Sequence, residues 1–552
     1  MIITVTPTTK IAIVSTLILL RVLVGYQPHS GQDDHHGKLN AYGGDYEAQR
    51  HWMELTLHLP MGDWYWYDLE YWGLDYPPLT AYVSWLCGYF SDKLIGPESV
   101  ALYTSRGYED PTHKAYMRAT VLVLDILVYI SIVWLSTKVP NRNHTNETIW
   151  SVIFALSQPA IILIDHGHFQ YNSVSLGLAL WGFYYMTKDK FFPNCLVGSV
   201  FFCLALNFKQ MILYYAPAVF AYLLGRCFDS GRRNILPRFV ALGITVILTF
   251  ALHWWPFLYY GPSHEESDKN NNNNIVSTAT TVIDRLLHVT HRMFPFNRGL
   301  FEDKVSNLWC VMSIKPISIR QRLPENLQPL IALSLTCCLI LPACFKLFRI
   351  GYSSSSRRWQ KDFKYLLWGS ANTALAFFLA SFQVHEKSIL MALAPISLLL
   401  WDDAVFCSWF GIISTWTLWP LLCIDRLQVA YTCVMLIYLI VISFLFDDDD
   451  DDDTIQSATT NTTTTSLPLL QSSLSNCSKI LKTVLIPISV VGMLSLHGLQ
   501  MVITPPATLP DLFPLLWSIA GCGMFSISWF VTTWHLYKGE EKRPLSMKEK
   551  IN

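Results

Sequence analysis

Long apolar segments recur along most of the 552-residue chain, and they limit what it can fold into. Many of them approach the roughly 17–25 residues that an α-helix needs to cross the hydrocarbon core of a bilayer. Strands of a membrane barrel are near ten residues long and alternate in polarity, whereas these segments are continuously apolar. Because only helices and closed barrels satisfy their backbone groups in lipid, the sequence predicts an all-α polytopic membrane protein.

The apolar segments number about fourteen, and each is a candidate transmembrane helix. A further apolar stretch, 78–90, is short and lies inside a polar loop, which predicts a helix lying at the membrane surface. The candidate spans are 11–26, 118–138, 149–164, 174–186, 195–208, 211–227, 239–260, 327–348, 365–381, 389–401, 405–423, 428–446, 480–500 and 512–536.

Composition excludes other classes of protein. Hydrophobic residues make up 52% of the chain and charged residues only 15%, against about 25% charged residues in soluble domains. The net charge of −1 gives no reason to expect a nucleic-acid partner. The thirteen cysteines are scattered, mostly in apolar segments, which is typical of small buried side chains and not of a disulfide framework or a metal cluster.

The distribution of Lys and Arg predicts the orientation of the chain. If the N-terminus is cytosolic, the Lys/Arg-rich connections fall on the cytosolic side, as the positive-inside rule requires. The lumenal side then receives two long polar loops. The expected organisation is a first membrane module at 1–260 with a lumenal loop at 27–117, a second lumenal loop at 261–326, a second module at 327–446, a disordered Asp/Thr/Ser-rich cytosolic linker at 447–479, and the last two spans with a cytosolic tail at 480–552.

The tail predicts where the protein resides. It ends with Lys548 and Lys550 at the fifth and third positions from the C-terminus. This spacing resembles a dilysine endoplasmic-reticulum retrieval signal, which is recognised from the cytosol. An endoplasmic-reticulum membrane protein with both ends in the cytosol is therefore expected.

The first lumenal loop carries the acidic residues of most interest. Asp45 and Glu47 lie at the start of an amphipathic stretch that predicts a helix at 47–59. One interpretation is a base that takes a proton from an acceptor hydroxyl, and the alternative is an acidic residue that caps the helix. Asp75 precedes two prolines that stiffen its backbone, and it reads equally well as a turn residue. The aromatic run 64–72 could stack on sugar rings or form an interfacial belt, and the belt is favoured.

Three further polar groups interrupt apolar surroundings. The segment Asp165-His-Gly-His-Phe-Gln-Tyr-Asn172 could bind metal, although no His/Cys partner pair of the usual spacing occurs elsewhere, and substrate hydrogen bonding is favoured. Lys209 and the segment 383–387 place ionisable groups at membrane depth, where such groups are expensive and commonly functional. Together with Arg298 in the second lumenal loop, they are candidate cations for a lipid-linked phosphate.

Six motifs, in order, resemble the dolichyl-phosphate-glucose-dependent glucosyltransferases of N-glycan assembly, and the match is best to the members that add the first glucose. Second-glucose members typically read Phe-Glu-Val-His-Arg-Asn-Trp where this chain has Glu47-Ala-Gln-Arg-His-Trp52. The motifs are Gly44-Asp-Tyr-Glu-Ala-Gln-Arg-His-Trp52, Tyr71-Trp-Gly-Leu-Asp-Tyr-Pro-Pro-Leu79, Ser105-Arg-Gly-Tyr-Glu109, Asp165-His-Gly-His-Phe-Gln-Tyr-Asn172, Phe301-Glu-Asp-Lys304 and Gln383-Val-His-Glu-Lys387.

The resemblance implies a GT-C fold and an inverting, metal-independent transfer of glucose. The donor is dolichyl-phosphate-glucose, and the acceptor is Man9GlcNAc2 on dolichyl diphosphate, which receives the glucose in α-1,3 linkage. An inverting displacement needs one base, and the family's base corresponds to Asp45 here. No cofactor is expected. The predicted substrate-binding residues are Glu47, Arg50, Trp52, Asp75, Tyr76, Arg106, His166, His168, Gln170, Lys209, Arg298, His385 and Lys387, with His385 and Arg298 assigned to the leaving phosphate.

Other functions remain open at this stage. The second-glucose transferase and a mannosyltransferase share the expected architecture, and a non-catalytic lipid-binding scaffold would also need many spans. A lipid-linked sugar transporter or flippase would have buried polar residues too. No internal repeat is visible, and the loop before Arg118 is large and acidic for a simple gate. An enzyme is therefore favoured over a transporter.

Overall fold

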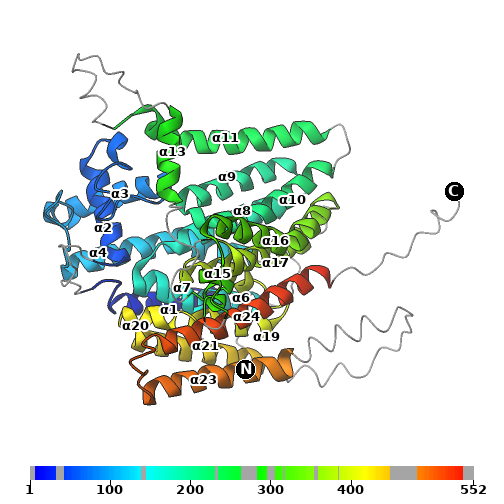
Figure 1. Cartoon of the computed structure of the whole chain (residues 1–552). Helices are drawn as coiled ribbons and strands as arrows, with labels where there is room; N and C mark the ends of the chain where they lie inside the picture. Colours follow the sequence, from blue (N-terminus) through cyan, green and yellow to red (C-terminus); the bar gives the residue numbers. More distant parts are fainter. Residues whose placement is uncertain are drawn as a thin grey trace, which may run out of the picture.

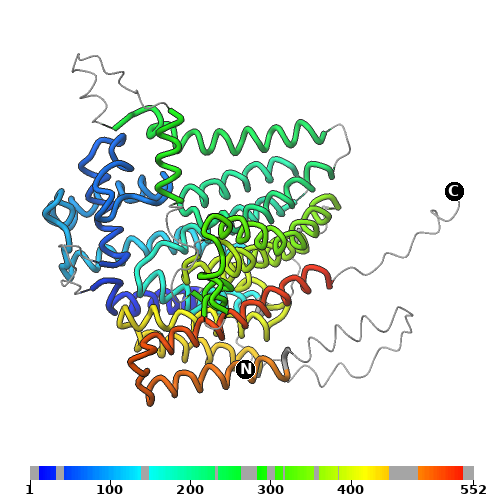
Figure 2. The backbone as a smooth tube through the Cα atoms, viewed as in Figure 1, coloured from blue at the N-terminus to red at the C-terminus, as the bar shows by residue number. Residues whose placement is uncertain are grey.

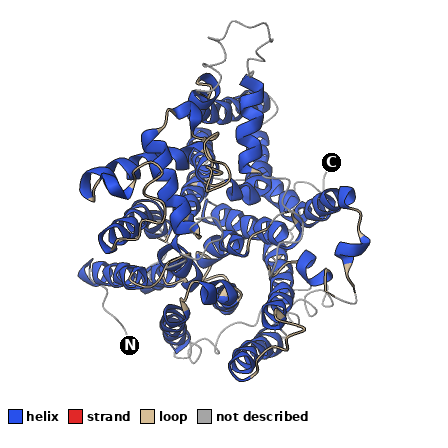
Figure 3. Ribbon diagram, turned by 60° about the vertical axis from the view of Figure 1, so that its left-hand side comes forward, coloured by secondary structure: helices blue, strands red, loops and turns tan. Residues whose placement is uncertain are grey.

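The computed structural model describes residues 7–32, 43–137, 145–189, 191–229, 234–262, 282–294, 305–314, 317–353, 359–382, 384–447 and 481–538. Within these residues all regular structure is helical (Figures 1 and 3), as the sequence predicts. The helices are α1 (Pro7–Gly25), α2 (Asp45–His58), η1 (Met61–Asp63), α3 (Pro78–Leu94), η2 (Pro97–Ser99), α4 (Pro111–Leu124), η3 (Asp125–Ile130), α5 (Ser131–Ser136), α6 (Thr145–Leu156), α7 (Pro159–Ile162), η4 (Leu163–Phe169), α8 (Asn172–Thr187), α9 (Phe192–Phe208), η5 (Gln210–Tyr215), α10 (Ala216–Phe228), α11 (Ile235–Tyr259), α13 (Val282–Met293), α14 (Leu308–Met312), α15 (Ile319–Arg322), η7 (Glu325–Leu327), α16 (Gln328–Tyr352), α17 (Trp359–Ala380), η8 (Glu386–Ile389), α18 (Leu390–Ser397), α19 (Ala404–Trp416), α20 (Trp419–Ile424), α21 (Gln428–Asp447), η9 (Leu481–Leu485), α23 (Ile486–Val502) and α24 (Leu512–Tyr537).

Seven helices of the described chain are long and apolar enough to cross a membrane, and a bent pair, Thr148–Leu156 with Pro159–Phe169, adds an eighth candidate. Shorter apolar helices at Ile11–Gly25, Phe192–Phe208 and Ala404–Trp416 join them. The chain is therefore a multi-span membrane protein. Every predicted span contains helix, but the total of about fourteen crossings stays a prediction.

Three predicted spans are not single long helices, and one of them, 149–164, is the bent pair named above. The segment 389–401 contains only α18, and eight residues extend for about 12 Å, which is less than half the hydrocarbon thickness. Pro395 lies inside that helix, and the chain turns soon after it. The segment 405–423 is divided into α19 and α20. Broken helices of this kind are tolerated at membrane depth where they are buried in protein, as α18 is.

The long helices run side by side, and the helices of the first loop lie at one end of them (Figure 1). The predicted helices at 47–59 and 78–90 are present as α2 and α3. In the tube view, α13 (green), from the middle of the sequence, lies beside this blue N-terminal region (Figure 2). Two contacts fix the arrangement, because His288 lies 3.0 Å from the Tyr65 carbonyl oxygen and Arg292 donates to the Gly73 carbonyl oxygen at 3.1 Å.

The aromatic run of the first loop is partly interior. Trp64 is 3% exposed and Tyr65 1% exposed, and both pack with Trp254 and Phe257 of α11. These two rings are therefore neither a membrane-interface belt nor an open platform for sugar, which are the two roles considered for them from sequence. They form a small core that anchors the first loop to α11.

Candidate active site

Asp45 is the first residue of α2, and it does not cap that helix. The preceding residue, Gly44, adopts φ 92°, and a Cβ there would lie 2.3 Å from the Ser30 carbonyl oxygen. Only glycine fits this turn. The start of α2 has no side-chain capping hydrogen bond. The carboxylate of Asp45 is instead directed at residues from distant parts of the chain, so the capping interpretation is wrong.

Three side chains donate to one oxygen of this carboxylate, Oδ2. His168 Nε2 lies 2.7 Å away and Lys387 Nζ 2.5 Å away, and the Gln170 amide donates to the same atom. Within the described residues Oδ1 makes no hydrogen bond. The Asp45 side chain is 24% exposed. One carboxylate oxygen is thus fully engaged, and the other is left for a ligand.

The end of the bent helix pair brings His168 and Gln170 to Asp45. The segment η4 is a π-helical turn, a widened form that often occurs at functional sites. It ends at Phe169, whose φ of 88° is strained for a bulky residue. Gln170 then continues as extended chain. Ser30 connects the backbone at His168 to the backbone at Asp45. Its N–H donates to the His168 carbonyl oxygen at 3.0 Å, and its hydroxyl accepts from the Asp45 N–H at 3.3 Å.

Asp425 completes the cluster and was not predicted from sequence. Its Oδ2 lies 2.5 Å from His168 Nδ1, so the imidazole is held between two carboxylates. If both ring nitrogens donate, the ring carries a positive charge. Asp425 sits in the turn between α20 and α21, where the next residue, Arg426, has φ 60°. Its only sequence signal is an acidic residue at the end of an apolar run.

Charge balance keeps the cluster ionised. Burial acts to raise the pKa of Asp45, but the positive charges of Lys387 and His168 outweigh it and hold the pKa of that carboxyl well below its usual range. Burial likewise opposes the ammonium of Lys387, yet attraction to Asp45 leaves the pKa of Lys387 above its ordinary value. Asp45 and Lys387 therefore form an ion pair that persists across the physiological pH range.

A second lysine adjoins the cluster. Lys209 Nζ donates to Gln170 Oε1 at 3.2 Å and to Asn172 Oδ1 at 2.6 Å, and it lies 5.2 Å from the ring centre of Tyr76. The Tyr76 hydroxyl donates to Gln170 Oε1 at 3.4 Å. Gln170 thus links Lys209 and Tyr76 to Asp45. Lys387 thus contacts the Asp45 carboxylate directly, and Lys209 is linked to it through Gln170.

The sequence matches the ALG6, ALG8 glycosyltransferase family over residues 17–531. The chain belongs to this family. It is 40% identical over 487 residues to the mouse (Mus musculus) dolichyl pyrophosphate Man9GlcNAc2 alpha-1,3-glucosyltransferase, covering 87% of this chain and 88% of the relative. The chicken (Gallus gallus) protein of the same name is 39% identical over 521 residues, covering 93% and 94%. The Saccharomyces cerevisiae protein of that name is 36% identical over 543 residues, covering 96% and 91%.

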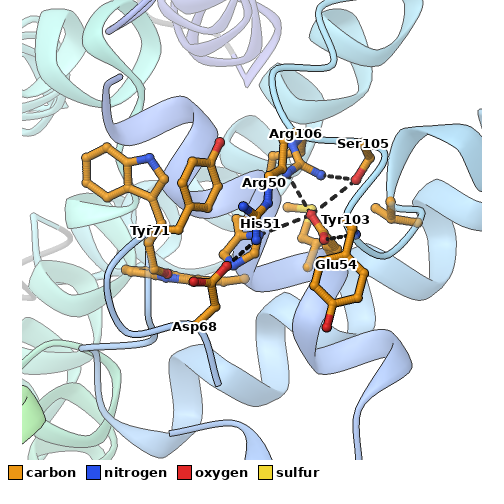
Figure 4. A network of polar contacts seen from close by, with 12 residues as sticks. Arg50, His51, Glu54, Asp68, Tyr71, Tyr103, Ser105 and Arg106 are labelled. Atoms are coloured by element: carbon orange, nitrogen blue, oxygen red, sulfur yellow. Dashed lines mark hydrogen bonds and ion pairs between the residues drawn. The ribbon is translucent and has the colours of Figure 1, made fainter. Parts of the chain in front are cut away.

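In this family member, three of the predicted substrate-binding residues belong to a different network. Arg50 is completely buried and bonds Glu47 through two nitrogens at 2.7 Å, Glu54 at 2.7 Å and Ser105 at 2.5 Å (Figure 4). Arg106 pairs with Asp68 nearby. Residues 45 and 47 point to different faces of a helix. Glu47, Arg50 and Arg106 thus have binding partners other than the Asp45 cluster.

The other predicted residues have separate environments. Trp52 donates to the Trp72 carbonyl oxygen at 2.9 Å and packs against Tyr76, with ring centres 4.8 Å apart. The backbone oxygen of Asp75 accepts from Gln210 at 3.4 Å, which ties the turn to η5. His166 Nε2 lies 3.0 Å from Asp125 and so faces away from Asp45.

The two residues assigned to the leaving phosphate have different outcomes. His385 is exposed at the start of η8, two residues before Lys387. Arg298 lies outside the described residues. Lys387 and Lys209 are instead the cations that the described part of the chain brings to Asp45 or its partner Gln170.

The Asp165–His168 segment does not converge as a metal site. Asp165 accepts from Asn172 and from the backbone N–H of Ser173, while His166 faces Asp125 and His168 lies between two other carboxylates. Across the described ranges, no group of three His, Cys, Asp or Glu side chains has the arrangement to hold a metal ion. The side chains of this segment therefore serve hydrogen bonding.

Proposed function

We propose that this chain transfers glucose from dolichyl-phosphate-glucose to the Man9GlcNAc2 oligosaccharide carried on dolichyl diphosphate, forming an α-1,3 linkage with inversion. Membership of a glycosyltransferase family and the shared name of relatives 36–40% identical over most of the chain support the reaction. The dolichyl-phosphate donor follows from the motif resemblance. The carrying observation is a carboxylate that has one unengaged oxygen, is bound by Lys387 and is linked through Gln170 to Lys209.

Asp45 acts as the base in this proposal. Its Oδ1 accepts the proton of the acceptor mannose hydroxyl while that oxygen attacks the anomeric carbon of glucose. The bond from that carbon to the phosphate oxygen breaks, and dolichyl phosphate leaves with the electron pair. Phosphate is a competent leaving group, so no general acid is needed. A positioned base contributes roughly a hundred- to ten-thousand-fold in rate.

Lys387 exchanges its partner when the donor binds, leaving Asp45 for the donor phosphate. In the free protein it binds Asp45 at 2.5 Å and depresses the pKa of that carboxyl, which weakens the base. The donor phosphate competes for the same ammonium, because a phosphate is a stronger partner for a cation than a single shared carboxylate oxygen. Binding of donor thereby raises the basicity of Asp45. His385 and Arg298 remain proposed phosphate contacts in addition to Lys387.

We place the reaction at the lumenal face of the endoplasmic-reticulum membrane. The Lys/Arg-rich connections, the dilysine-like tail and the position of the first-loop helices at one end of the long helices support this orientation. The retrieval tail lies outside the described residues. Labelling of cysteines introduced at 104, an exposed position of the first loop, and at 540 tests the assignment, with residue 540 accessible in sealed microsomes and residue 104 accessible only after they are opened.

Reconstitution of the full-length protein with a synthetic dolichyl-phosphate-glucose analogue and defined acceptors tests the reaction. We expect one glucose to be added to the Man9GlcNAc2 acceptor, with α-1,3 linkage in the product and no loss of activity in EDTA. An acceptor that already carries one glucose is the control for the second-glucose reaction. Transfer only to that acceptor, or activity lost in EDTA and restored by magnesium, would overturn the proposal as stated.

A further inference from the structure

Helix α13, in the second polar loop, is attached to the rest of the protein along one side. Arg285 donates to the carbonyl oxygens of Leu258 and Tyr259, at the end of α11, at 2.9 and 3.0 Å. Val289 and Met293 are buried in the small core that anchors the first loop to α11. Together with the two contacts to the first loop described above, these interactions fix α13 between the first loop and α11.

A neighbouring face of α13 carries an uncovered apolar stripe. Its members follow one another at intervals of one, three and one positions, which places them together on one helical face. Two polar residues, Asp284 and His291, lie beyond the edge of this stripe and are also exposed. Contiguous exposed apolar side chains of this kind mark an interaction surface. The apolar stripe consists of Val282, Ile283, Leu286 and Leu287, which are 55%, 66%, 40% and 60% exposed.

The end of α11 that α13 contacts carries exposed aromatic rings, namely Trp255, Tyr259 and Tyr260. Helix α11 is long and apolar enough to cross a membrane, and only 11% of its most apolar window is buried inside the protein. Most of this helix therefore faces lipid. Exposed Trp and Tyr at the end of such a span are typical of the boundary between membrane and water. The Arg285 contacts thus place α13 at that boundary.

The direction of α13 fits the same place. It runs across the long helices instead of along them (Figures 1 and 2). Because the long helices cross the bilayer, a helix that lies across their ends lies along the membrane plane. Amphipathic helices bury an apolar face between head groups and acyl chains in this orientation. A stable protein partner would cover about 800 Å², which is more than four aliphatic side chains provide.

We propose that α13 inserts its apolar stripe into the membrane surface on the side of the first loop, and that this lipid contact holds the first loop in place. The other side of the helix carries the connection. Arg292 donates to the Gly73 carbonyl oxygen at 3.1 Å, and the ring of His288 stacks on Trp66 with ring centres 3.6 Å apart. The partner of α13 is thus the bilayer itself. The proposal does not rest on the proposed function.

Fluorescence quenching in the full-length protein tests the insertion. An environment-sensitive fluorescent amino acid is placed at 283 or 286, within the apolar stripe, or at 284 or 291, outside it, and the protein is reconstituted in phosphatidylcholine nanodiscs. We expect lipid brominated on its acyl chains to quench 283 and 286 roughly threefold more than 284 and 291, and aqueous iodide to give the reverse order. Position 244 of α11, where Ile244 is 51% exposed, is the matched lipid-facing control. Equal quenching of the four positions, or protection of 283 and 286 from both quenchers, overturns the proposal.

Hydrogen exchange in the same nanodiscs tests the hold on the first loop. Ile283→Asp makes insertion unfavourable, while an acidic residue in the first turn suits the helix itself. We expect backbone exchange of residues 61–75 to rise roughly threefold or more in this variant. Ile283→Leu keeps the stripe apolar and is the matched control, with exchange at the wild-type level. Faster exchange in both variants, or in neither, overturns the proposed hold. The quenching experiment introduces no charge, so it stays decisive if Ile283→Asp unfolds α13.

Discussion

Helix α2 carries two polar clusters that are built in opposite ways. The cluster around Asp45 joins residues 123 and 342 positions away in the chain, and its carboxylate is partly exposed with one oxygen unengaged. The cluster around Arg50 joins Glu47 and Glu54 of the same helix and Ser105, and all three guanidinium nitrogens are used (Figure 4). The first is assembled by the whole fold, and the second is assembled by the first loop alone.

This difference distinguishes a candidate ligand site, the Asp45 cluster, from a structural network, the Arg50 cluster. Closed networks of buried charge stabilise one conformation only while every partner is present. An open network that leaves an acceptor atom facing solvent can accommodate a ligand. We therefore expect charged residues close together in sequence to differ in what their loss costs: activity for Asp45, and folding of the first loop for Arg50.

Replacing Asp45 with Asn gives the largest expected effect on turnover. The amide keeps the size of the side chain but cannot accept a proton, so transfer drops by roughly a hundred- to ten-thousand-fold. The protein stays folded and binds the donor at least as tightly as wild type, because Lys387 no longer shares its charge with Asp45. Single-turnover transfer and donor-analogue binding measure the two quantities. Near-normal transfer by Asp45→Asn removes this residue from the mechanism and erases the contrast between the clusters.

Removal of Arg50 is expected to affect folding first. Arg50→Leu leaves two buried carboxylates, Glu47 and Glu54, without their cation, and breaking a buried pair costs about 3–5 kcal/mol. Thermal unfolding in detergent measures this loss. Arg106→Gln is the matched control, because its pair with Asp68 is partly exposed and such pairs contribute less than about 1 kcal/mol. A stable Arg50→Leu protein with reduced substrate affinity would instead return Arg50 to the substrate site.

The pH dependence of stability gives a second test of the Arg50 cluster, through Glu54. Burial opposes ionisation of Glu54, but His51 and Arg50 outweigh it and lower the pKa of that carboxyl from 4.5 to about 2. The stabilisation that comes from a lowered carboxyl pKa is fully present above the pKa of the unfolded state. It is lost as the pH falls through the pKa of the folded state. We expect Glu54→Gln to be less stable than wild type at pH 7, by roughly 2–3 kcal/mol, and the gap to narrow between pH 4.5 and 2. A gap independent of pH contradicts this.

Asp425 gives the smallest expected effect in the comparison. Asp425→Asn weakens the hold on His168, and loss of a carboxylate that orients a histidine typically costs ten- to a hundredfold at metal sites. We expect a loss of that order in transfer with an altered pH profile, since the charge of His168 depends on both of its neighbours. Asp425→Glu partly restores activity. An unchanged pH profile with a lower unfolding temperature would mark Asp425 as merely structural.

The sequence predicts most members of the Asp45 cluster, but not the features that position them. The motif resemblance singles out Asp45, His168, Gln170 and Lys387, and the structure brings them together. Asp425 has only a weak local signal, an acidic residue at the end of an apolar run, because partners more than 250 positions apart leave no periodicity in the chain. The positive φ of Phe169 is equally invisible in the sequence, since residues of this type rarely adopt it.

The Arg50 cluster could have been recognised from spacing alone. Glu47, Arg50 and Glu54 follow one another at intervals of three and four, which places them on one helical face. The resemblance drew attention to their motif as a substrate site, and their binding role stays a prediction. The short helix α18 is missed for a different reason, because hydropathy averages over a segment and does not register where Pro395 and the following turn end the helix.

The order in which the chain is synthesised determines when the Asp45 cluster can be complete. The proposed base is synthesised early, but its neighbours Lys387 and Asp425 emerge only after most of the spans have been translated. A nascent chain therefore holds the acid long before it holds the groups that set its charge. On the proposed mechanism, a chain truncated before residue 387 lacks both groups, and we expect it to be inactive in glucose transfer.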